Sequence, residues 1–196
     1  MDQHLENKVC LITGATNGIG EESAKELNKM GAEIIFIARN EEKGNKLKEE
    51  LLKDSGREAT MIIADLSSQD QVKKAAEQFL SLDKPLDILL NNAGIMNRER
   101  NETVDGLEEV FSVNHLAYFT FTLMLSEKLK QTEGSRVINV ASGAHQFVKN
   151  MNFDDLQSKE NYKPMQVYGQ SKLANILFTK ALSTKLSDFG VTVNCL

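Results

Sequence analysis

The sequence predicts an α/β fold in which helices cover both faces of a doubly wound parallel sheet. Two observations support this fold: apolar strand-like runs alternate with longer amphipathic stretches, and most of those runs are continuously apolar. Continuous apolar runs are typical of strands that are buried on both faces, as in a parallel sheet. Repeated strand–helix–strand units imply right-handed crossovers. For six such strands we expect the Rossmann-type order 3-2-1-4-5-6.

Six apolar runs are the candidate strands, and five amphipathic stretches are the candidate helices. The strands are expected at residues 9–13, 33–38, 60–64, 86–90, 136–140 and 191–195. The helices are expected at residues 19–30, 41–54, 68–80, 104–132 and 165–189. Gly31 and Gly56 fall just past the ends of two helices, where a left-handed cap residue is needed. The stretch 104–132 is long, and we expect it to break into two helices near Val113.

Two further stretches stand out. Residues 142–164 are the longest stretch without an obvious element, and a loop of this length in a compact domain is often functional. The chain ends inside its last apolar run, 191–196, with nothing that turns it back out of the sheet. We therefore expect a C-terminally shortened piece of a longer protein, in preference to a short natural variant.

Length and composition predict one soluble domain over residues 1–196. The net charge of -5 argues against a broad surface for nucleic acid. No apolar run approaches the ~20 residues that a membrane-spanning helix needs. The N-terminal residues 1–6 lack the apolar core of a signal peptide, so a cytoplasmic location is expected.

The cysteines and histidines give no sign of a metal or redox site. Cys10 and Cys195 lie in apolar strand-like runs, where buried free thiols are expected rather than a disulfide. The histidines are scattered and lack the spacing of metal ligands; they are His4, His115 and His145. No metal site is predicted.

A glycine-rich turn follows the first candidate strand and precedes a candidate helix. It reads Thr13-Gly14-Ala15-Thr16-Asn17-Gly18-Ile19-Gly20. Gly14 allows a tight turn, Gly18 lets a pyrophosphate approach, and Gly20 lets helix and strand pack closely. The helix N-terminus then offers free N–H groups to phosphates. Such a motif alone is weak evidence and fits a plain turn, but the strand before it and the helix after it raise its weight. The predicted phosphate-binding residues are Gly14, Thr16, Asn17, Gly18, Ile19 and Gly20.

The end of the second candidate strand favours a cofactor with a 2′-phosphate. Dinucleotide-binding units that prefer NAD usually place an Asp or Glu here, on the ribose 2′-hydroxyl. This chain has Arg39 followed by Asn40, and a guanidinium can clamp a phosphate and stack on adenine. NADP(H) is therefore the expected cofactor. The alternative, a solvated arginine at a strand end, leaves NAD(H) open.

The glycine spacing, Gly-x-x-x-Gly-x-Gly after a threonine, resembles that of the short-chain dehydrogenase/reductase family. The turn Asn91-Asn92-Ala93-Gly94 is similar to the Asn-Asn-Ala-Gly signature of that family, and it follows the fourth candidate strand, where a ligand should lie. A plain turn is the alternative. Asp65 and Leu66 after the third strand are similar to the family's adenine contact. The resemblance thus implies cofactor contacts at Asp65, Leu66, Asn92, Ala93 and Gly94.

Tyr168 and Lys172 form the most informative pair of residues, because they lie four apart in a candidate helix and share one face. A free tyrosine has a pKa of about 10 and is a poor base at neutral pH. A lysine cation one turn away favours the phenolate and lowers that pKa. The pair can then move a proton to or from a carbonyl or alcohol oxygen. By itself the spacing is common, and most instances are exposed helix faces.

The family pattern is Asn, Ser, Tyr and Lys in that order, and the chain supplies Asn114, Ser142, Tyr168 and Lys172. The resemblance implies that Tyr168 is the general acid/base and that Lys172 lowers its pKa and holds the nicotinamide ribose. It also implies that Ser142 orients the substrate oxygen and that Asn114 supports a water-linked proton relay to Lys172. Taken singly, Ser142 fits a helix cap and Asn114 a helix-breaking polar residue.

Within the family the chain looks most like the retinol-dehydrogenase-like branch. The residues that carry this resemblance are Arg39, Asn114-His115-Leu116, Ser142-Gly143-Ala144-His145 and residues 168–178. The resemblance implies an oxidoreductase that moves a hydride between NADP(H) and a carbonyl or alcohol of a small molecule. Family members commonly pair through the helices over 113–132 and 165–189, which implies a homodimer or homotetramer. The alternatives are an NAD-linked dehydrogenase and a binding or interaction module without turnover.

Overall fold

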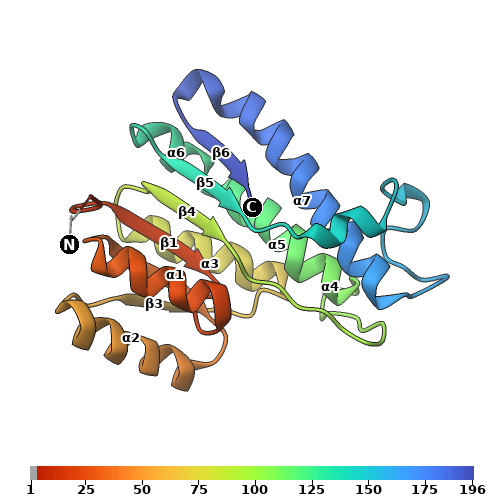
Figure 1. Cartoon of the computed structure of the whole chain (residues 1–196), viewed down its shortest axis with the longest axis horizontal. Coiled ribbons are helices and arrows are strands. Elements are labelled where there is room, and N and C mark those ends of the chain that lie inside the picture. Colours follow the sequence, from red (N-terminus) through yellow and green to blue (C-terminus); the bar gives the residue numbers. More distant parts are fainter. Residues whose placement is uncertain (1–3) are drawn as a thin grey trace.

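The computed structural model describes residues 4–196 and contains one six-stranded parallel sheet (Figure 1). The strand order is β3-β2-β1-β4-β5-β6, which confirms the predicted order. The strands are β1 (Val9–Thr13), β2 (Glu33–Ala38), β3 (Thr60–Ile63), β4 (Ile88–Asn91), β5 (Arg136–Asn139) and β6 (Thr192–Cys195). All residues of the central strand β1 are buried, as expected for a strand covered on both faces.

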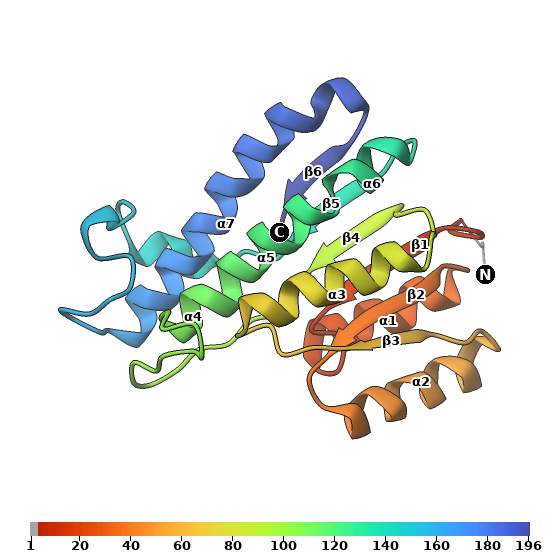
Figure 2. The ribbon, with the colours of Figure 1, turned by 180° about the vertical axis from the view of Figure 1, so that it is seen from behind.

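Helices cover both faces of the sheet (Figures 1 and 2). The helices are α1 (Gly18–Lys29), α2 (Glu41–Ser55), α3 (Gln69–Ser81), α4 (Glu109–Phe111), α5 (Ala117–Met124), α6 (Ser126–Gln131) and α7 (Pro164–Leu186). On one face, α1 and α2 pack on alternate residues of β1 and β2, among them Ile12 and Phe36. On the other face, α3, α5, α6 and α7 pack on the intervening residues, among them Leu11 and Ile35. The period-two alternation of each strand therefore feeds two separate cores.

The long stretch 104–132 differs from its prediction at its start. Residues 104–108 are not helical, and the helix begins at Glu109. The carboxylate of Glu108 accepts the N–H groups of Val110 at 2.8 Å and Phe111 at 2.6 Å. It therefore caps the helix where a shorter polar residue is more usual. Burial raises the pKa of this carboxyl, although the two N–H groups oppose that shift.

The predicted break into two helices near Val113 is wrong, because the chain changes its type of helix there and does not leave the helical conformation. Residues Ser112–Leu116 form a π-helical turn, and the chain stays helical into α5. The α-helix is interrupted later, at Leu125, between α5 and α6. Asn114 lies inside the π-helical turn, and such turns often mark functional sites.

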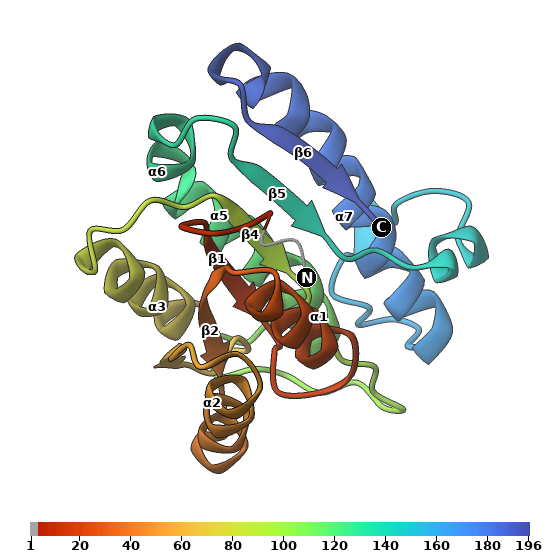
Figure 3. The same ribbon diagram turned by 60° about the vertical axis from the view of Figure 1, so that its left-hand side comes forward.

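The stretch 142–164, which the sequence left without elements, holds two short 3-10 helices, Gly143–Phe147 and Phe153–Asp155. Pro164 ends this stretch as the first residue of α7, where its missing N–H leaves no partner unsatisfied. Figure 3 shows β5 and β6 side by side and α7 beside them. The stretch therefore leads from the end of β5 to the start of α7.

Cys10 is buried as expected, whereas Cys195 is only partly buried because β6 is an edge strand. Across residues 4–196, no group of three or more His, Cys, Asp or Glu side chains is placed to hold a metal ion. Among the helices described, none is long and apolar enough to cross a membrane. Residues 1–3 of the predicted single domain lie outside the described part.

Candidate active site

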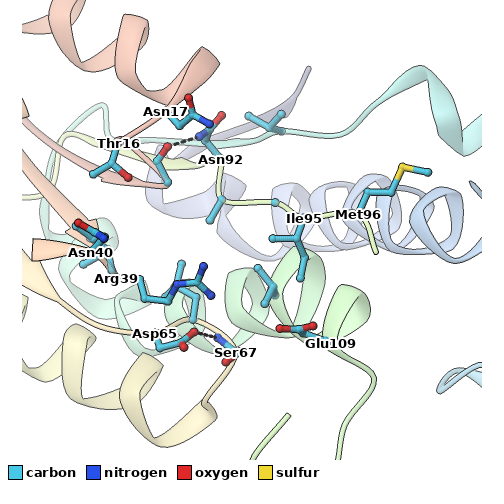
Figure 4. Close-up of a pocket in the computed structure, with 18 of the residues that line it drawn as sticks. Thr16, Asn17, Arg39, Asn40, Asp65, Ser67, Asn92, Ile95, Met96 and Glu109 are labelled. Carbon is cyan, nitrogen blue, oxygen red and sulfur yellow. Dashed lines mark hydrogen bonds between the residues drawn. The ribbon is translucent and has the colours of Figure 1, made fainter. Parts of the chain in front are cut away.

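A cavity of about 790 Å³ lies at the carboxyl ends of the central strands (Figure 4). Most of the predicted site residues line it: Gly14, Thr16, Asn17, Ile19, Arg39, Asn40, Asp65, Leu66, Asn92, Ala93, Gly94, Tyr168 and Lys172. Four predicted residues do not line it: Gly18, Gly20, Asn114 and Ser142. The contacts of these four show what each contributes.

The glycine turn is locked against the turn after β4. Gly14 has a φ of +67°, and a Cβ on it would lie 2.7 Å from the Cα of Ala93. A Cβ on Gly20 would overlap the carbonyl oxygen of Gly14 and the side-chain amide of Asn92. Gly14 and Gly20 therefore allow a close approach that any larger residue would prevent.

Two polar side chains form hydrogen bonds between the glycine turn and the turn after β4. The Oγ1 of Thr13 accepts the N–H groups of Asn92 at 2.9 Å and Ala93 at 3.1 Å. In return, the Nδ2 of Asn92 donates to the carbonyl oxygens of Thr13 and Gly14. The sequence prediction missed Thr13 as a site residue, although it directly precedes the glycine motif.

The start of α1 leaves room and donors for an anion. Gly18 has a φ of +56°, and no atom lies within 4 Å of the position of a Cβ. Asn17, the residue that precedes α1, makes no side-chain hydrogen bond to the first turn. The first N–H groups of the helix are therefore not capped by that side chain, and a helix N-terminus with free N–H groups attracts phosphate.

Cations gather at the outer end of the cavity, which we define by Arg39, Asn40, Lys43 and Asp65. Arg39 and Asn40 are exposed, and Figure 4 shows their side chains at the cavity edge. Asn40 caps α2 by accepting the N–H of Lys43 at 2.8 Å. This cap places Lys43 one turn from Arg39, so two cations line the outer end. The sequence prediction missed Lys43, for which the only signal was its spacing of four from Arg39.

The carboxylate of Asp65 serves first as a turn former. Its Oδ1 accepts the N–H of Ser67 at 2.9 Å, which tightens the chain after β3 (Figure 4). Ser67 also lines the cavity. Asp65 and Ser67 thus form the wall opposite the glycine turn.

Lys172 lies at the inner end of the cavity, which we define by Gly94, Val140, Tyr168 and Lys172. It is only 2% exposed, and its Nζ donates to the carbonyl oxygen of Val140 at 3.0 Å. Burial lowers its pKa from 10.5 to about 8. A buried ammonium with one carbonyl partner retains donors for a ligand in the cavity.

Two tyrosine rings face this ammonium. The Nζ of Lys172 lies 5.5 Å from the ring centre of Tyr168 and 5.9 Å from that of Tyr118. Tyr118 is 1% exposed, donates its hydroxyl to the carbonyl of Ala93 at 2.8 Å, and burial raises its pKa. Tyr168 is partly exposed and lines the cavity. Tyr168 is therefore the tyrosine that a ligand can reach.

Ser142 lies just past the end of β5 and starts the first 3-10 helix. Its Oγ accepts the N–H of Ala144 at 3.2 Å. A Cβ on Gly169 would lie 2.7 Å from the carbonyl oxygen of Ala144. The absence of a side chain at Gly169 therefore lets the segment after Ser142 approach α7 beside Tyr168. The sequence prediction missed Gly169.

The side chain of Asn114 is 0% exposed and fully engaged. Its Oδ1 accepts the N–H of Ile95 at 2.8 Å, and its Nδ2 donates to the carbonyl of Ile95 at 2.9 Å. Nδ2 also faces the Oγ of Ser171 at 3.1 Å. Asn114 thus holds the loop after β4 against the π-helical turn.

The chain matches known proteins over nearly its whole length. The sequence model of the family described as short chain dehydrogenase matches residues 8–196. Retinol dehydrogenase 12 of Mus musculus is 41% identical over 189 residues, which cover 96% of this chain and 60% of that protein. Retinol dehydrogenase 11 of Homo sapiens is 41% identical over 189 residues, covering 96% of this chain and 59% of that protein.

A solved structure shows the same fold. The L-sorbose reductase of Gluconobacter frateurii, complexed with NADPH and L-sorbose, has a TM-score of 0.82 and 25% identity. The match covers 100% of this chain and 70% of that one. The chain spans about 60% of the length of the retinol dehydrogenases above. On the residues matched by the family model, the chain belongs to the short chain dehydrogenase family, and it is similar to the retinol dehydrogenases above.

Proposed function

We propose that the chain carries the cofactor-binding and catalytic part of an oxidoreductase that moves a hydride between NADP(H) and a carbonyl or alcohol. The observation that carries the proposal is the buried ammonium of Lys172 beside the cavity-lining Tyr168. Both lie at the opposite end of one cavity from the cations Arg39 and Lys43. A long ligand with a phosphate at one end and a reactive group at the other fits this arrangement.

The lining residues suit a nicotinamide dinucleotide phosphate. The open space above Gly18 and the start of α1 would take the pyrophosphate. Arg39 and Lys43 would take a 2′-phosphate, since a guanidinium can bind it through two hydrogen bonds and an ammonium adds a second positive charge. The cavity volume of about 790 Å³ lies within the ordinary range of ligand sites.

The chain's own residues would move the proton. The nicotinamide, when bound, supplies or accepts the hydride. In reduction, the hydroxyl of Tyr168 would donate its proton to the carbonyl oxygen, and in oxidation its phenolate would accept the alcohol proton. The ammonium of Lys172 would hold ribose hydroxyls with its remaining donors. The Oγ of Ser142 would orient the substrate oxygen.

The relatives' names suggest where to look for a substrate. The chain is similar to proteins named retinol dehydrogenases, so retinal is a first compound to test among lipophilic carbonyls. Half-exposed apolar side chains on α5 and α7, namely Phe119, Leu123 and Leu177, would suit pairing with a second copy. The expected cytoplasmic location stays a prediction. The comparisons do not favour a binding module without turnover.

The test is a titration of the purified chain with NADPH and NADH, followed by fluorescence, and then a screen of carbonyl compounds. We expect tighter binding of NADPH, and turnover of at least one carbonyl. Tyr168→Phe serves as a control that should bind NADPH like the parent chain but fail in the screen. Equal or tighter NADH binding would reject the cofactor assignment, and failure to bind either nucleotide would reject the proposal for this chain.

A further inference from the structure

Asn175 lies on α7 outside the cavity, and its side chain forms hydrogen bonds with the π-helical turn. It is 0% exposed. Its Nδ2 donates to the carbonyl oxygen of Asn114 at 2.8 Å, and its Oδ1 lies 3.0 Å from the Nδ1 of His115. Asn175 therefore holds two successive residues of that turn, one of which belongs to the predicted catalytic set.

The same side chain also reaches the carbonyl that binds Lys172. The Nδ2 of Asn175 approaches the oxygen of Val140 at 3.5 Å, and the Nζ of Lys172 donates to that oxygen at 3.0 Å. One carbonyl oxygen, with two lone pairs, is thus shared between the ammonium and the amide. The titratable groups whose rings lie near the ammonium are Tyr168 from α7 and Tyr118 from α5, and just past β5 the Val140 carbonyl accepts its hydrogen bond.

The orientation of the amide follows from its partners. The oxygens of Asn114 and Val140 can only accept hydrogen bonds, so the NH₂ group must face them. Oδ1 is left to accept from His115, which requires the tautomer that carries its proton on Nδ1. Burial lowers the pKa of His115 and so favours the neutral ring. A flipped amide would oppose oxygen to oxygen at two places, so the observed orientation is the stable one.

We propose that Asn175 is a positioning residue, which fixes the Lys172 ammonium and the Asn114 carbonyl relative to each other through its bonds to Asn114 and Val140. The inference rests on the proposed function, which assigns Lys172 to the catalytic site, and on the predicted set of catalytic residues, which includes Asn114. It adds a residue that acts through others and touches neither cofactor nor substrate. A displacement of about 1 Å in such a site is enough to reduce turnover ~100-fold.

The test compares Asn175→Leu with Asn28→Leu. Asn28 serves as a control for the loss of a buried amide, since it is also 0% exposed and its side-chain oxygen accepts a hydrogen bond from Ser55, but it lies in α1 away from the catalytic residues. The main measurement is the titration of the Lys172 ε-carbon by NMR in chain labelled with ¹³C-lysine, assigned by the signal's loss in Lys172→Arg. The dissociation constant of NADPH, the melting temperature and, where a substrate is found, kcat are measured alongside.

We expect the Lys172 midpoint, about 8 in the parent, to rise by at least ~0.5 unit in Asn175→Leu. The reason is that the Val140 oxygen then serves the ammonium alone, without the positive end of the amide beside it. We expect kcat to fall at least ~10-fold while the NADPH dissociation constant stays within ~3-fold. Asn28→Leu should leave the Lys172 midpoint in place.

An unchanged Lys172 midpoint in Asn175→Leu, or an equal fall of kcat in both variants, would overturn the proposal and leave Asn175 a structural residue. Should Asn175→Leu fail to fold, Asn175→Ser, which is smaller and keeps a hydroxyl, carries the same measurement. Absence of turnover in the parent chain would count against the proposed function only. The Lys172 midpoint would still decide the role of Asn175, because that measurement needs no turnover.

Discussion

The two ends of the cavity are built on opposite physical principles. At the outer end, Arg39, Asn40 and Lys43 are exposed, and their positions follow from one strand end and one helix cap. At the inner end, Lys172 is 2% exposed and bonded to a main-chain carbonyl, and Asn114 and Asn175 behind it are both 0% exposed. The outer end is therefore held by local chain geometry, and the inner end by contacts between distant segments.

The difference concerns stability as well as position. Exposed charges are well solvated and contribute little to folding either way. A buried ammonium is disfavoured by burial, and a pKa lowered from 10.5 to about 8 corresponds to roughly 3 kcal/mol at neutral pH. The inner end thus keeps a group that destabilises the fold, which is typical of functional sites. Substitution of a cation at the outer end should therefore weaken cofactor binding and leave stability unchanged. Substitution of Lys172 at the inner end should lower turnover and raise stability.

The largest expected effect is the loss of turnover in Tyr168→Phe, by ~10²- to 10⁴-fold in kcat, since the general acid/base is removed. Its matched control is Tyr118→Phe, which removes the other hydroxyl near Lys172. Because the Tyr118 hydroxyl is bonded to the buried carbonyl of Ala93, this control should lower the free energy of unfolding by about 1–2 kcal/mol and reduce kcat far less. Equal losses of kcat would mean that Tyr168 is not the proton donor.

Lys172→Met should lower turnover and yet stabilise the fold. We expect the free energy of unfolding at pH 7 to rise by about 2 kcal/mol, because relief from burying the ammonium exceeds the loss of one hydrogen bond. In the parent, the unfolded state binds this proton up to pH 10.5 and the folded state only up to about 8, so parent stability rises between these values. The gain of the variant should therefore shrink above pH 8. Urea unfolding at pH 7 and pH 10 tests this, and a less stable variant at pH 7 would contradict it.

Arg39→Asp should reverse the cofactor preference with little effect on stability. We expect the NADPH dissociation constant to rise ~10- to 100-fold, from the lost bonds to phosphate and the added repulsion, while NADH binding is kept. The melting temperature should stay near that of the parent, because the residue is exposed. The measurement is the fluorescence titration with both nucleotides. An unchanged ratio of the two constants would show that Arg39 does not select the cofactor.

The smallest expected effect is that of Lys43→Ala, a ~3- to 10-fold weaker binding of NADPH with NADH unaffected. Since Lys43 is exposed, its attraction to a 2′-phosphate should be screened by salt. The difference between the NADPH dissociation constants of parent and variant should therefore be smaller at high salt than at low salt. A difference that persists at high salt would point to a structural effect at the start of α2. Lys46→Ala is the control, because it removes the same charge from the same helix.

Much of the fold could be predicted because the local signals agree with one another. The strands 9–13 and 33–38 are found at the predicted residues as β1 and β2, since continuous apolar runs mark buried parallel strands. Gly56 caps α2 in the left-handed conformation with a φ of 73°, as its place predicted. The predicted helix start at residue 104 was wrong, because the helix begins after a buried glutamate cap. Buried glutamates are rare, and no sequence pattern signals them.

The site divides in the same way. The sequence by itself determined the glycine turn, the cation after β2 and the pairing of Tyr168 with Lys172, because each depends on residues within about one helical turn of one another. Only the tertiary structure decided that Asn114 turns its side chain to Ile95, that Asn175 holds its carbonyl, and that Gly169 lets the segment after Ser142 approach. These contacts join segments that are 19 to 61 residues apart, and no local spacing encodes which distant carbonyl a buried amide will meet.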